Sequence, residues 1–437
     1  MRSRRTLLLA WAIAGLGAHA AWAQDIGEVL ISRTTAARHG LQRAWFAHVE
    51  LDRSSEEVAY ITRQAGTIFV QTSRAVVHAI DAETGRTQWA IQIGRHGLLS
   101  LAPAANEKVV AVVNGSTLYL VDRKNGRLKS DHVLSGAPGA GPALSDKRVF
   151  VPMVNGLVES YLIDEPLTKP KSFQSTGRIF VQPIVTTLTV AWTTDRGHFY
   201  IVDREKNEIR LRLETDGSIE SPPVYWPPYV YATSLSGFVY AIDEVTGQTA
   251  WKFAAGDPVG QSPLAVGGMV YVVKDNGGLY QLDGATGDPR WFAAGITQML
   301  SVSPTRVYAS DRFQRLAILD RKSGALLDTL PLGTMSFRLM NRETDRIYLC
   351  TRHGQLECLH EVGLTLPAVH KLPPPPVALG AEKKDADAKA PAKKKAADAE
   401  EGADTETGEG EADATEDAAK KPADKEAAST DEEEVFK

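Results

Sequence analysis

Cysteine is scarce in this chain of 437 residues, which contains only Cys350 and Cys358. Two cysteines exclude a disulfide-dense scaffold and leave at most one bond. Long apolar runs are missing beyond the amino terminus, so the sequence predicts no transmembrane span. The motifs Gly-x-Ser-x-Gly and His-Glu-x-x-His, a phosphate-binding loop, a calcium loop and short-spaced histidine pairs are also absent. We therefore predict no catalytic residues, no metal site and no bound cofactor.

An excess of basic charge is lacking as well. The net charge of the whole chain is −5, but residues 381–437 alone carry 10 lysines against 19 acidic residues. When this acidic tail and the basic amino terminus are set aside, the middle of the chain is close to neutral. A nucleic-acid-binding protein would be expected to carry a basic face. The charge distribution therefore gives no support for nucleic-acid binding.

The two ends of the sequence differ from its middle. Three arginines precede a short apolar run, and Ala-Trp-Ala at 21–23 fits a cleavage site, so residues 1–23 are predicted to be a secretory signal peptide. No cysteine follows the run, which argues against a lipid anchor. Residues 24–39 form a lead-in to the globular part. Residues 373–437 begin with four prolines and continue as an Ala-, Lys-, Glu- and Asp-rich tail, predicted to be a disordered spacer or, alternatively, a docking segment.

A phrase recurs through the middle of the chain, and Val239–Phe253 (VYAIDEVTGQTAWKF) is its clearest copy. Its aspartate returns at intervals of 37 to 42 residues, with His360 in the eighth place: Asp81, Asp122, Asp164, Asp203, Asp243, Asp283 and Asp320. Such a period matches one four-stranded propeller blade. We therefore predict an all-β fold, an eight-bladed β-propeller with blades of about 40 residues, over residues 40–372.

Five of the eight units contain the turn Asp-x-x-x-Gly, in which the aspartate can accept backbone N–H groups and the glycine supplies a positive φ. Unit four has Asn207 instead of the glycine, and units three and eight depart from the pattern. Tryptophans four residues after the glycine would cover the joint between blades. The predicted structural anchors are Asp81, Gly85, Trp89, Asp122, Gly126, Asp203, Asp243, Gly247, Trp251, Asp283, Gly287, Trp291, Asp320 and Gly324.

The amino-terminal strand offers a way to close the ring. The stretch from Gly40 to Val49 imitates the glycine-to-tryptophan strand of the repeat and contains Trp45, whereas the eighth unit lacks this tryptophan. We expect the amino-terminal strand to complete the last blade, because circular closure removes exposed sheet edges.

The two cysteines flank the last predicted hairpin, and two registers are open. A two-residue turn at His353-Gly354 would place Cys350 and Cys358 on opposite faces of the hairpin. A three- or five-residue loop centred on Gly354 would set them opposite each other, where they could form a disulfide. Two buried free thiols are the alternative.

The phrase Leu-Tyr-x-Leu-Asp-x-x-Thr-Gly-x-x-x-Trp resembles the repeat named after pyrroloquinoline quinone (PQQ), found in quinoprotein alcohol dehydrogenases and in the outer-membrane assembly factor BamB. The resemblance covers residues 40 to about 366 and implies a propeller fold. The dehydrogenase branch implies a quinone, a calcium site and, in many members, a disulfide between adjacent cysteines. None of these features is indicated here, because no two cysteines are adjacent and the blades lack long insertions. The BamB branch implies an exported scaffold.

Two segments stand out as candidate contact surfaces. One carries Tyr225, Trp226 and Tyr229 among four prolines, where other units have a short polar turn. Aromatic residues with rigid neighbours suit a contact face because little entropy is lost on binding. The other segment, Arg312-Phe313-Gln314-Arg315, replaces a glycine-bearing turn. The alternatives are that Trp226 packs against a neighbouring blade and that residues 312–315 form a less regular hairpin.

These observations favour a non-enzymatic protein-interaction scaffold, exported to the periplasm or cell envelope and BamB-like in outer-membrane protein assembly. Its expected partners are proteins, including envelope assembly components, and we expect it to be a monomer. A PQQ-dependent dehydrogenase and a small-ligand sensor that uses the central channel are the alternative functions.

Overall fold

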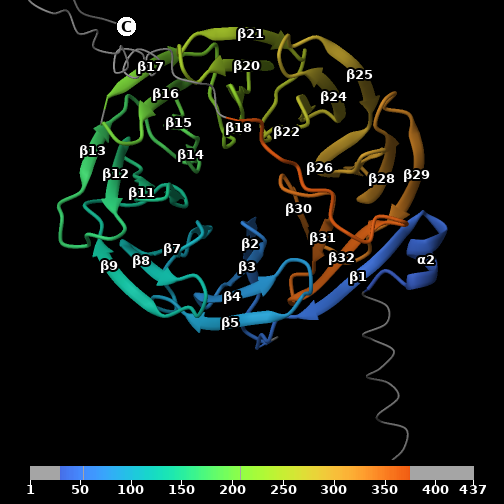
Figure 1. The fold of residues 1–437 in the computed structure, drawn as a ribbon, viewed down its shortest axis with the longest axis horizontal. Helices are drawn as coiled ribbons and strands as arrows, with labels where there is room; N and C mark the ends of the chain where they lie inside the picture. Colours follow the sequence, from blue (N-terminus) through green and yellow to red (C-terminus); the bar gives the residue numbers. More distant parts are fainter. Residues whose placement is uncertain (1–29, 53, 207, 375–437) are drawn as a thin grey trace, which may run out of the picture. The chain divides into compact units, whose positions relative to one another are not determined.

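The computed structural model describes residues 30–52, 54–206 and 208–374. The predicted signal peptide and most of the predicted tail therefore lie outside the described residues. Within them the chain forms eight four-stranded antiparallel sheets arranged as a ring (Figure 1). The prediction of an all-β, eight-bladed propeller is confirmed. No helix in the described ranges is both long and apolar enough to cross a membrane.

Blades 1 to 4 follow one another along the chain. Their strands are β2 (Val58–Gln64), β3 (Thr67–Thr72), β4 (Val76–Asp81) and β5 (Thr87–Gln92) in blade 1, β6 (Ala104–Ala105), β7 (Val109–Asn114), β8 (Thr117–Asp122) and β9 (Leu128–Val133) in blade 2, β10 (Ala143–Leu144), β11 (Arg148–Pro152), β12 (Leu157–Leu162) and β13 (Lys171–Gln174) in blade 3, and β14 (Ile184–Val185), β15 (Thr189–Thr193), β16 (His198–Asp203) and β17 (Ile209–Glu214) in blade 4.

Blades 5 to 8 repeat the arrangement. Their strands are β18 (Val224–Trp226), β19 (Tyr229–Thr233), β20 (Phe238–Asp243) and β21 (Thr249–Ala254) in blade 5, β22 (Leu264–Val266), β23 (Met269–Val273), β24 (Gly278–Asp283) and β25 (Pro289–Ala294) in blade 6, β26 (Ile296–Val302), β27 (Arg306–Asp311), β28 (Arg315–Asp320) and β29 (Leu326–Pro331) in blade 7, and β30 (Phe337–Leu339), β31 (Ile347–Cys350), β32 (Gln355–Glu361) and β1 (Leu41–His48) in blade 8.

The burial of the strands explains their sequences. The second strand of a blade is packed between two neighbouring blades, so β3 and β7 are buried along their whole length, and β7 is a run of apolar residues that ends at Asn114. The fourth strands lie at the rim, and β17 alternates exposed and half-buried residues. Such alternation is typical of a strand that exposes one face to solvent.

The amino-terminal strand closes the ring, as predicted. Strand β1 pairs antiparallel with β32, with Trp45 opposite Cys358. The short helix α2 (Arg33–Arg38) precedes β1, and Ser32 caps it by accepting the N–H of Thr35 at 3.0 Å. The side chains of Arg43 and Glu357 join β1 to β32 through an ion pair of 2.7 Å that is almost fully buried. Blade 8 is therefore built from both ends of the folded unit.

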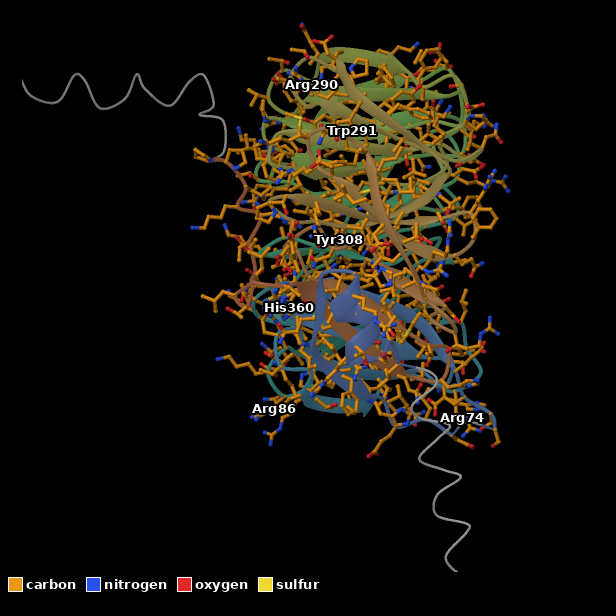
Figure 2. The ribbon with its side chains drawn as sticks, turned by 90° about the vertical axis from the view of Figure 1, so that its right-hand side faces the viewer. Arg74, Arg86, Arg290, Trp291, Tyr308 and His360 are labelled. Carbon is orange, nitrogen blue, oxygen red and sulfur yellow. The ribbon has the colours of Figure 1, made fainter. Side chains whose placement is uncertain are left out.

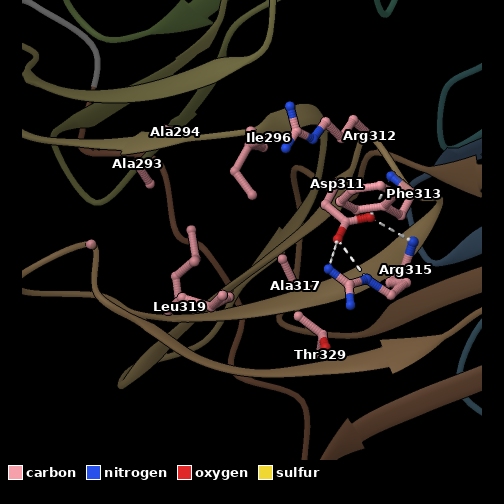
Figure 3. Close-up of a pocket in the computed structure, with 13 residues that line it drawn as sticks. Ala293, Ala294, Ile296, Asp311, Arg312, Phe313, Arg315, Ala317, Leu319 and Thr329 are labelled. Carbon is pink, nitrogen blue, oxygen red and sulfur yellow. Dashed lines mark hydrogen bonds and ion pairs between the residues drawn. The ribbon is translucent and has the colours of Figure 1, made fainter.

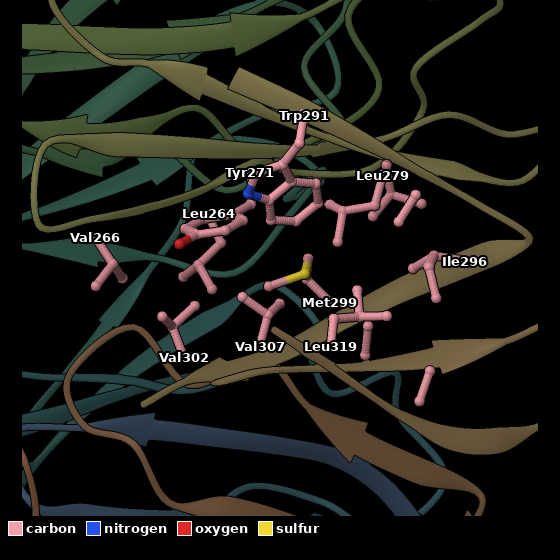
Figure 4. Close-up of a cluster of buried hydrophobic side chains, with 14 residues drawn as sticks. Leu264, Val266, Tyr271, Leu279, Trp291, Ile296, Met299, Val302, Val307 and Leu319 are labelled. Atoms are coloured by element: carbon pink, nitrogen blue, oxygen red, sulfur yellow. The ribbon is translucent and has the colours of Figure 1, made fainter. Parts of the chain in front are cut away.

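The hydrophobic core is divided among the joints between blades. In the joint between blades 6 and 7, Leu264, Tyr271 and Leu279 of blade 6 pack against Met299, Val307 and Leu319 of blade 7 (Figure 4). Each blade is thus covered on both sides by its neighbours, which is why a single blade could not bury its apolar faces alone.

The ring has two faces that differ in the turns they carry. The Asp–Gly face, as we name it, carries the first-to-second strand turns of all blades and the third-to-fourth strand turns of blades 1 to 7, including the turn with Arg86. The opposite face carries the second-to-third strand turns, including the turn with Arg74, and the connections between blades. Arg86 and Arg74 lie on opposite sides of the ring in Figure 2.

Candidate functional site

The aspartate turns follow one geometry. Asp81 Oδ1 accepts the N–H of Glu83 at 3.2 Å and of Thr84 at 2.8 Å, while Gly85, at a φ of 70°, donates its N–H to the Asp81 carbonyl. The same Asp-to-Gly closure occurs at Asp122, Asp243, Asp283 and Asp320. Each of these carboxylates accepts backbone N–H groups of its own turn and thereby helps to close it.

The tryptophans of the fourth strands reach across to the next blade. Trp291 Nε1 donates to the Arg321 carbonyl at 3.0 Å, and its ring lies against Gly324. Trp45, Trp89 and Trp251 make the same contact with the carbonyls of Ala82, Arg123 and Gly284. A Cβ on the facing glycine would overlap the ring, so the glycine is required by the close approach as well as by its positive φ.

The proline- and aromatic-rich segment of blade 5 is built into the structure. Trp226 is 9% exposed and packs with Val259 and Leu282, the latter in blade 6. The hydroxyl of Tyr225 donates to Glu244 Oε2 at 2.5 Å. Burial and this bond raise the pKa of Tyr225 above its usual value. Tyr229 is half-buried against the same cluster. Little of this segment is free for a partner.

In the segment at residues 312–315, the first three residues are exposed and Arg315 is half-buried. Phe313 is 64% exposed, and the guanidinium groups of Arg312 and Arg315 each lie 5.0 Å from the centre of its ring. Arg315 pairs with Asp311 at 2.7 Å. Although burial opposes the change, the bonds from Arg315 hold the pKa of Asp311 below its usual range. Arg312 has no carboxylate partner among the described residues. The segment thus presents an aromatic ring beside one free cation.

A groove of about 270 Å³ lies beside this segment, between blades 6 and 7 (Figure 3). Its apolar wall is formed by Ala293, Ala294, Ile296, Ala317, Leu319 and Leu326. Gly295 alone connects β25 to β26, whereas residues 255–263 separate β21 from β22 at the preceding joint. The interval from Asp283 to Asp320, 37 residues, is the shortest in the repeat series because this connection is short. Within the described part of the chain, no longer connecting segment covers the groove here.

The two predicted surfaces do not form one site. Residues 225–229 lie in and around the β18–β19 turn on the Asp–Gly face, whereas residues 312–315 lie in and around the β27–β28 turn on the opposite face. Strand direction fixes this separation, because successive turns of an antiparallel sheet alternate between its two ends.

Both cysteines are free and buried, and the register differs from both alternatives considered above. Cys350 faces Leu356 and Cys358 faces Tyr348, because residues 351–354 form a four-residue turn. Cys350 and Cys358 are therefore diagonal neighbours on the two strands. Diagonal neighbours have Cα atoms about 7–8 Å apart, which is too far for a relaxed disulfide. Burial raises the pKa of Cys350 to about 12 and raises that of Cys358 as well.

The sequence reading missed a segment that follows the last blade. The carbonyls of Leu364 and Thr365 accept Arg346 Nη1 and Nη2 at 2.9 and 2.7 Å, and Asp345 Oδ1 accepts the N–H of Ala368 at 2.9 Å. Residues 364–371, the carboxyl-terminal strap, thereby cross the Asp–Gly face near the channel (Figure 1). The apolar stretch Leu364-Thr-Leu-Pro-Ala-Val was the available signal.

The described residues contain no group of three or more His, Cys, Asp or Glu side chains that could hold a metal ion. The ring of eight four-stranded sheets and the repeated joints define the chain as an eight-bladed β-propeller. Within it, residues 221–349 match the family model described as outer membrane protein assembly factor BamB.

Solved structures agree with this fold. BamB from Moraxella catarrhalis is 16% identical with a TM-score of 0.59, over 73% of this chain and 99% of that chain. The computationally designed Ika8 protein is 13% identical with the same TM-score and the same coverage. At these identities the likeness concerns the fold alone. No curated protein matches the sequence.

Proposed function

We propose that the protein is a non-enzymatic scaffold of the cell envelope that binds partner proteins and takes part in outer-membrane protein assembly, as the description of the matching family model suggests. The observation that carries the proposal is the open groove between blades 6 and 7, with Phe313 exposed at its edge. Aromatic and arginine side chains are the residues that most often dominate protein interfaces.

The chemistry of the groove defines its occupant. Ala294, Ile296 and Leu319 belong to the apolar wall of the groove. Arg312 adds a positive charge that pairs with no carboxylate among the described residues. We infer that the groove accepts an extended segment of a partner protein with an apolar side chain next to a carboxylate. The apolar side chain of such a segment would exclude water from the apolar wall, and its carboxylate would pair with Arg312. Phe313 would cover the contact.

A photo-crosslinking amino acid at position 313 tests the proposal in intact cell envelopes. Position 128, a leucine 56% exposed on the rim strand β9, serves as the control. Outer-membrane barrel-assembly components should crosslink to position 313 and not to position 128. Equal crosslinking at both positions would exclude the groove.

A second comparison separates the groove from the wider role. The mature protein, its Phe313→Ala variant and a version ending at Pro376 are used to isolate partners after chemical crosslinking. Recovery of assembly components by all three would support the role but reject the groove. Loss in Phe313→Ala alone would support both, and loss only after truncation would assign docking to the tail. If none of the three recovers them, the scaffold proposal fails.

A further inference from the structure

The centre of the ring contains a polar cavity that the proposed scaffold role does not use. Its volume is about 250 Å³, and innermost residues of six blades line it, among them Gln64, Ala105, Leu144, Gln182, Pro223 and Arg342. The cavity lies in the central channel, because the first strand of each blade is the strand nearest the axis (Figure 1). Empty cavities inside proteins are usually lined by apolar side chains. The amide side chains and the guanidinium therefore indicate that this cavity has a role beyond packing.

Arg342 links blade 8 to blade 6. It follows β30 in blade 8, and its Nη2 donates to Ser262 Oγ in blade 6 at 2.8 Å. Ser262 Oγ in turn donates to the Pro222 carbonyl at 2.5 Å. The described residues offer Arg342 no carboxylate within ion-pair distance. Burial lowers the pKa of the Arg342 guanidinium to about 10, so it remains a cation at neutral pH.

Two other arginines with largely buried side chains have counter-charges, whereas the buried Arg148 donates to the Ser160 hydroxyl. Arg43 pairs with Glu357, and Arg63 pairs with Glu343, which also accepts the N–H groups of Ala65 and Gly66. Glu343 is the neighbour of Arg342 in sequence, but its oxygens are occupied by these partners. A half-buried charge without a counter-charge is costly, and a hydrogen bond donated to a serine hydroxyl does not neutralise it.

The carboxyl-terminal strap holds Arg342 in place. The N–H of His370 donates to the Glu343 carbonyl at 2.8 Å, and His370 Nδ1 lies 3.3 Å from the Arg342 carbonyl. His370 Nε2 lies 3.0 Å from the Val302 carbonyl in blade 7. The backbone at Arg342 is thus fixed from the strap and from a neighbouring blade, as a preorganised binding group requires.

We propose that the central channel binds a small oxyanion, such as phosphate or a short dicarboxylate, with the Arg342 guanidinium as its counter-charge. The planar guanidinium can donate two parallel bonds to such a group. Gln64 and Gln182 line the same cavity; Gln64 accepts the N–H of Ala105 and Gln182 donates one N–H to the Pro142 carbonyl, so their other amide N–H groups can donate to its remaining oxygens. The ligand replaces the missing counter-ion, which gives binding a favourable charge term.

Titration calorimetry with inorganic phosphate and with malonate tests the inference, using the mature protein in chloride buffer of matched ionic strength. Saturable binding is expected for at least one of the two anions. Arg342→Met should weaken it by at least about tenfold, because a charge-assisted bond contributes about 1.5–3 kcal/mol. Arg342→Lys should bind with intermediate affinity. Arg352→Met, at an exposed site on the opposite face, is the control for net charge and should bind like the unchanged protein.

The stability of the variants distinguishes binding from a purely structural role. If Arg342 serves an anion, Arg342→Met should unfold in chloride at a temperature no lower than the unchanged protein, and phosphate should raise the Tm of the unchanged protein only. If Arg342 is only a cross-link to Ser262, Arg342→Met should lower the Tm and no anion should bind. Absence of binding to the unchanged protein, or equal binding to Arg342→Met, overturns the inference. Should Arg342→Met not fold, Arg342→Lys must still bind more weakly.

Discussion

At the scale of single residues, the joint between blades depends on the fit of one indole to one glycine. Trp291 donates to a backbone carbonyl of the next blade and fills the space beside Gly324 that a side chain would occupy. Two requirements therefore meet at Gly324, which has a φ of 71° and no room for a Cβ. Where the tryptophan is absent, as in blade 4, Leu211 takes its place against Gly247.

Replacing Gly324 by alanine should lower the free energy of unfolding by more than the backbone term alone. The positive φ costs about 1–2 kcal/mol for a residue with a Cβ, and displacing the Trp291 ring adds to it. Gly256→Ala is the matched control, since Gly256 has a φ of 82° and open space around it. Urea unfolding of both variants measures the difference. Equal losses would show that the indole does not constrain the glycine.

At the scale of elements, β1 decides whether the ring is closed. It supplies the rim strand of blade 8, and its Trp45 makes toward blade 1 the contact that other fourth strands make toward their next blade. The buried pair of Arg43 and Glu357 joins this strand to β32, and Glu357 Oε2 also accepts the N–H of Ile31. Without β1, the edge of β32 and the face of blade 1 would both meet water.

Replacing Trp45 by alanine should destabilise the protein by about 3–5 kcal/mol, the usual cost of truncating a buried aromatic side chain. The neighbouring Phe46 points outward and is 58% exposed, so Phe46→Ala should change stability by less than about 0.5 kcal/mol. Denaturant unfolding gives both values, and hydrogen exchange should show faster opening of β32 in Trp45→Ala. Similar losses for the two variants would contradict closure through Trp45.

At the scale of the whole molecule, ionisable side chains in several blades set the response to acid. Hydrogen bonds from Arg290 hold the pKa of Asp283 below its usual 3.8, and the N–H and hydroxyl groups of Ser323 do the same for Asp320. Burial lowers the pKa of His78 and His370 below 6.5. Glu357 acts in the other sense, because burial raises its pKa more than the Arg43 guanidinium lowers it.

The sign of the pH dependence follows from these shifts. Groups with a depressed folded pKa contribute stability that is present above their unfolded pKa and lost as the pH falls. Stability should therefore decrease below about pH 6.5 through the histidines and again below about pH 3.8 through the aspartates. Asp283→Asn should be less stable than the parent at neutral pH, with a smaller loss below pH 3.8. Asp146→Asn, at an exposed turn, is the control, and urea midpoints across the pH range measure both.

Much of the architecture could be read from the sequence because it is repeated. The spacing of Asp81, Asp122 and their successors specified the blades, and local chemistry specified the turns, since an aspartate and a glycine close the same loop wherever they stand. The unusual Gly40–Val49 stretch was enough to predict closure. These inferences depend on interactions within one unit or between adjacent units.

The candidate sites were less accessible to sequence reasoning because they depend on contacts between distant units. Both Trp226 and Phe313 were candidate contact residues in the sequence. Packing between blades buries Trp226 and leaves Phe313 exposed, and the sequence does not show this difference. Two registers were considered for the hairpin at Cys350. The four-residue turn at 351–354 produces a third, in which Cys350 pairs with Leu356. Arg342 carried no motif at all.

The sequence by itself determined the class of fold, the number of blades and the position of the closing strand, because each follows from a period that any blade displays. Only the tertiary structure decided which face each surface occupies, that a shortened connection leaves a groove open, and that Arg342 lies unneutralised in the channel. The physical reason is that burial and charge compensation are properties of the assembled ring, to which eight units contribute and which no single unit encodes.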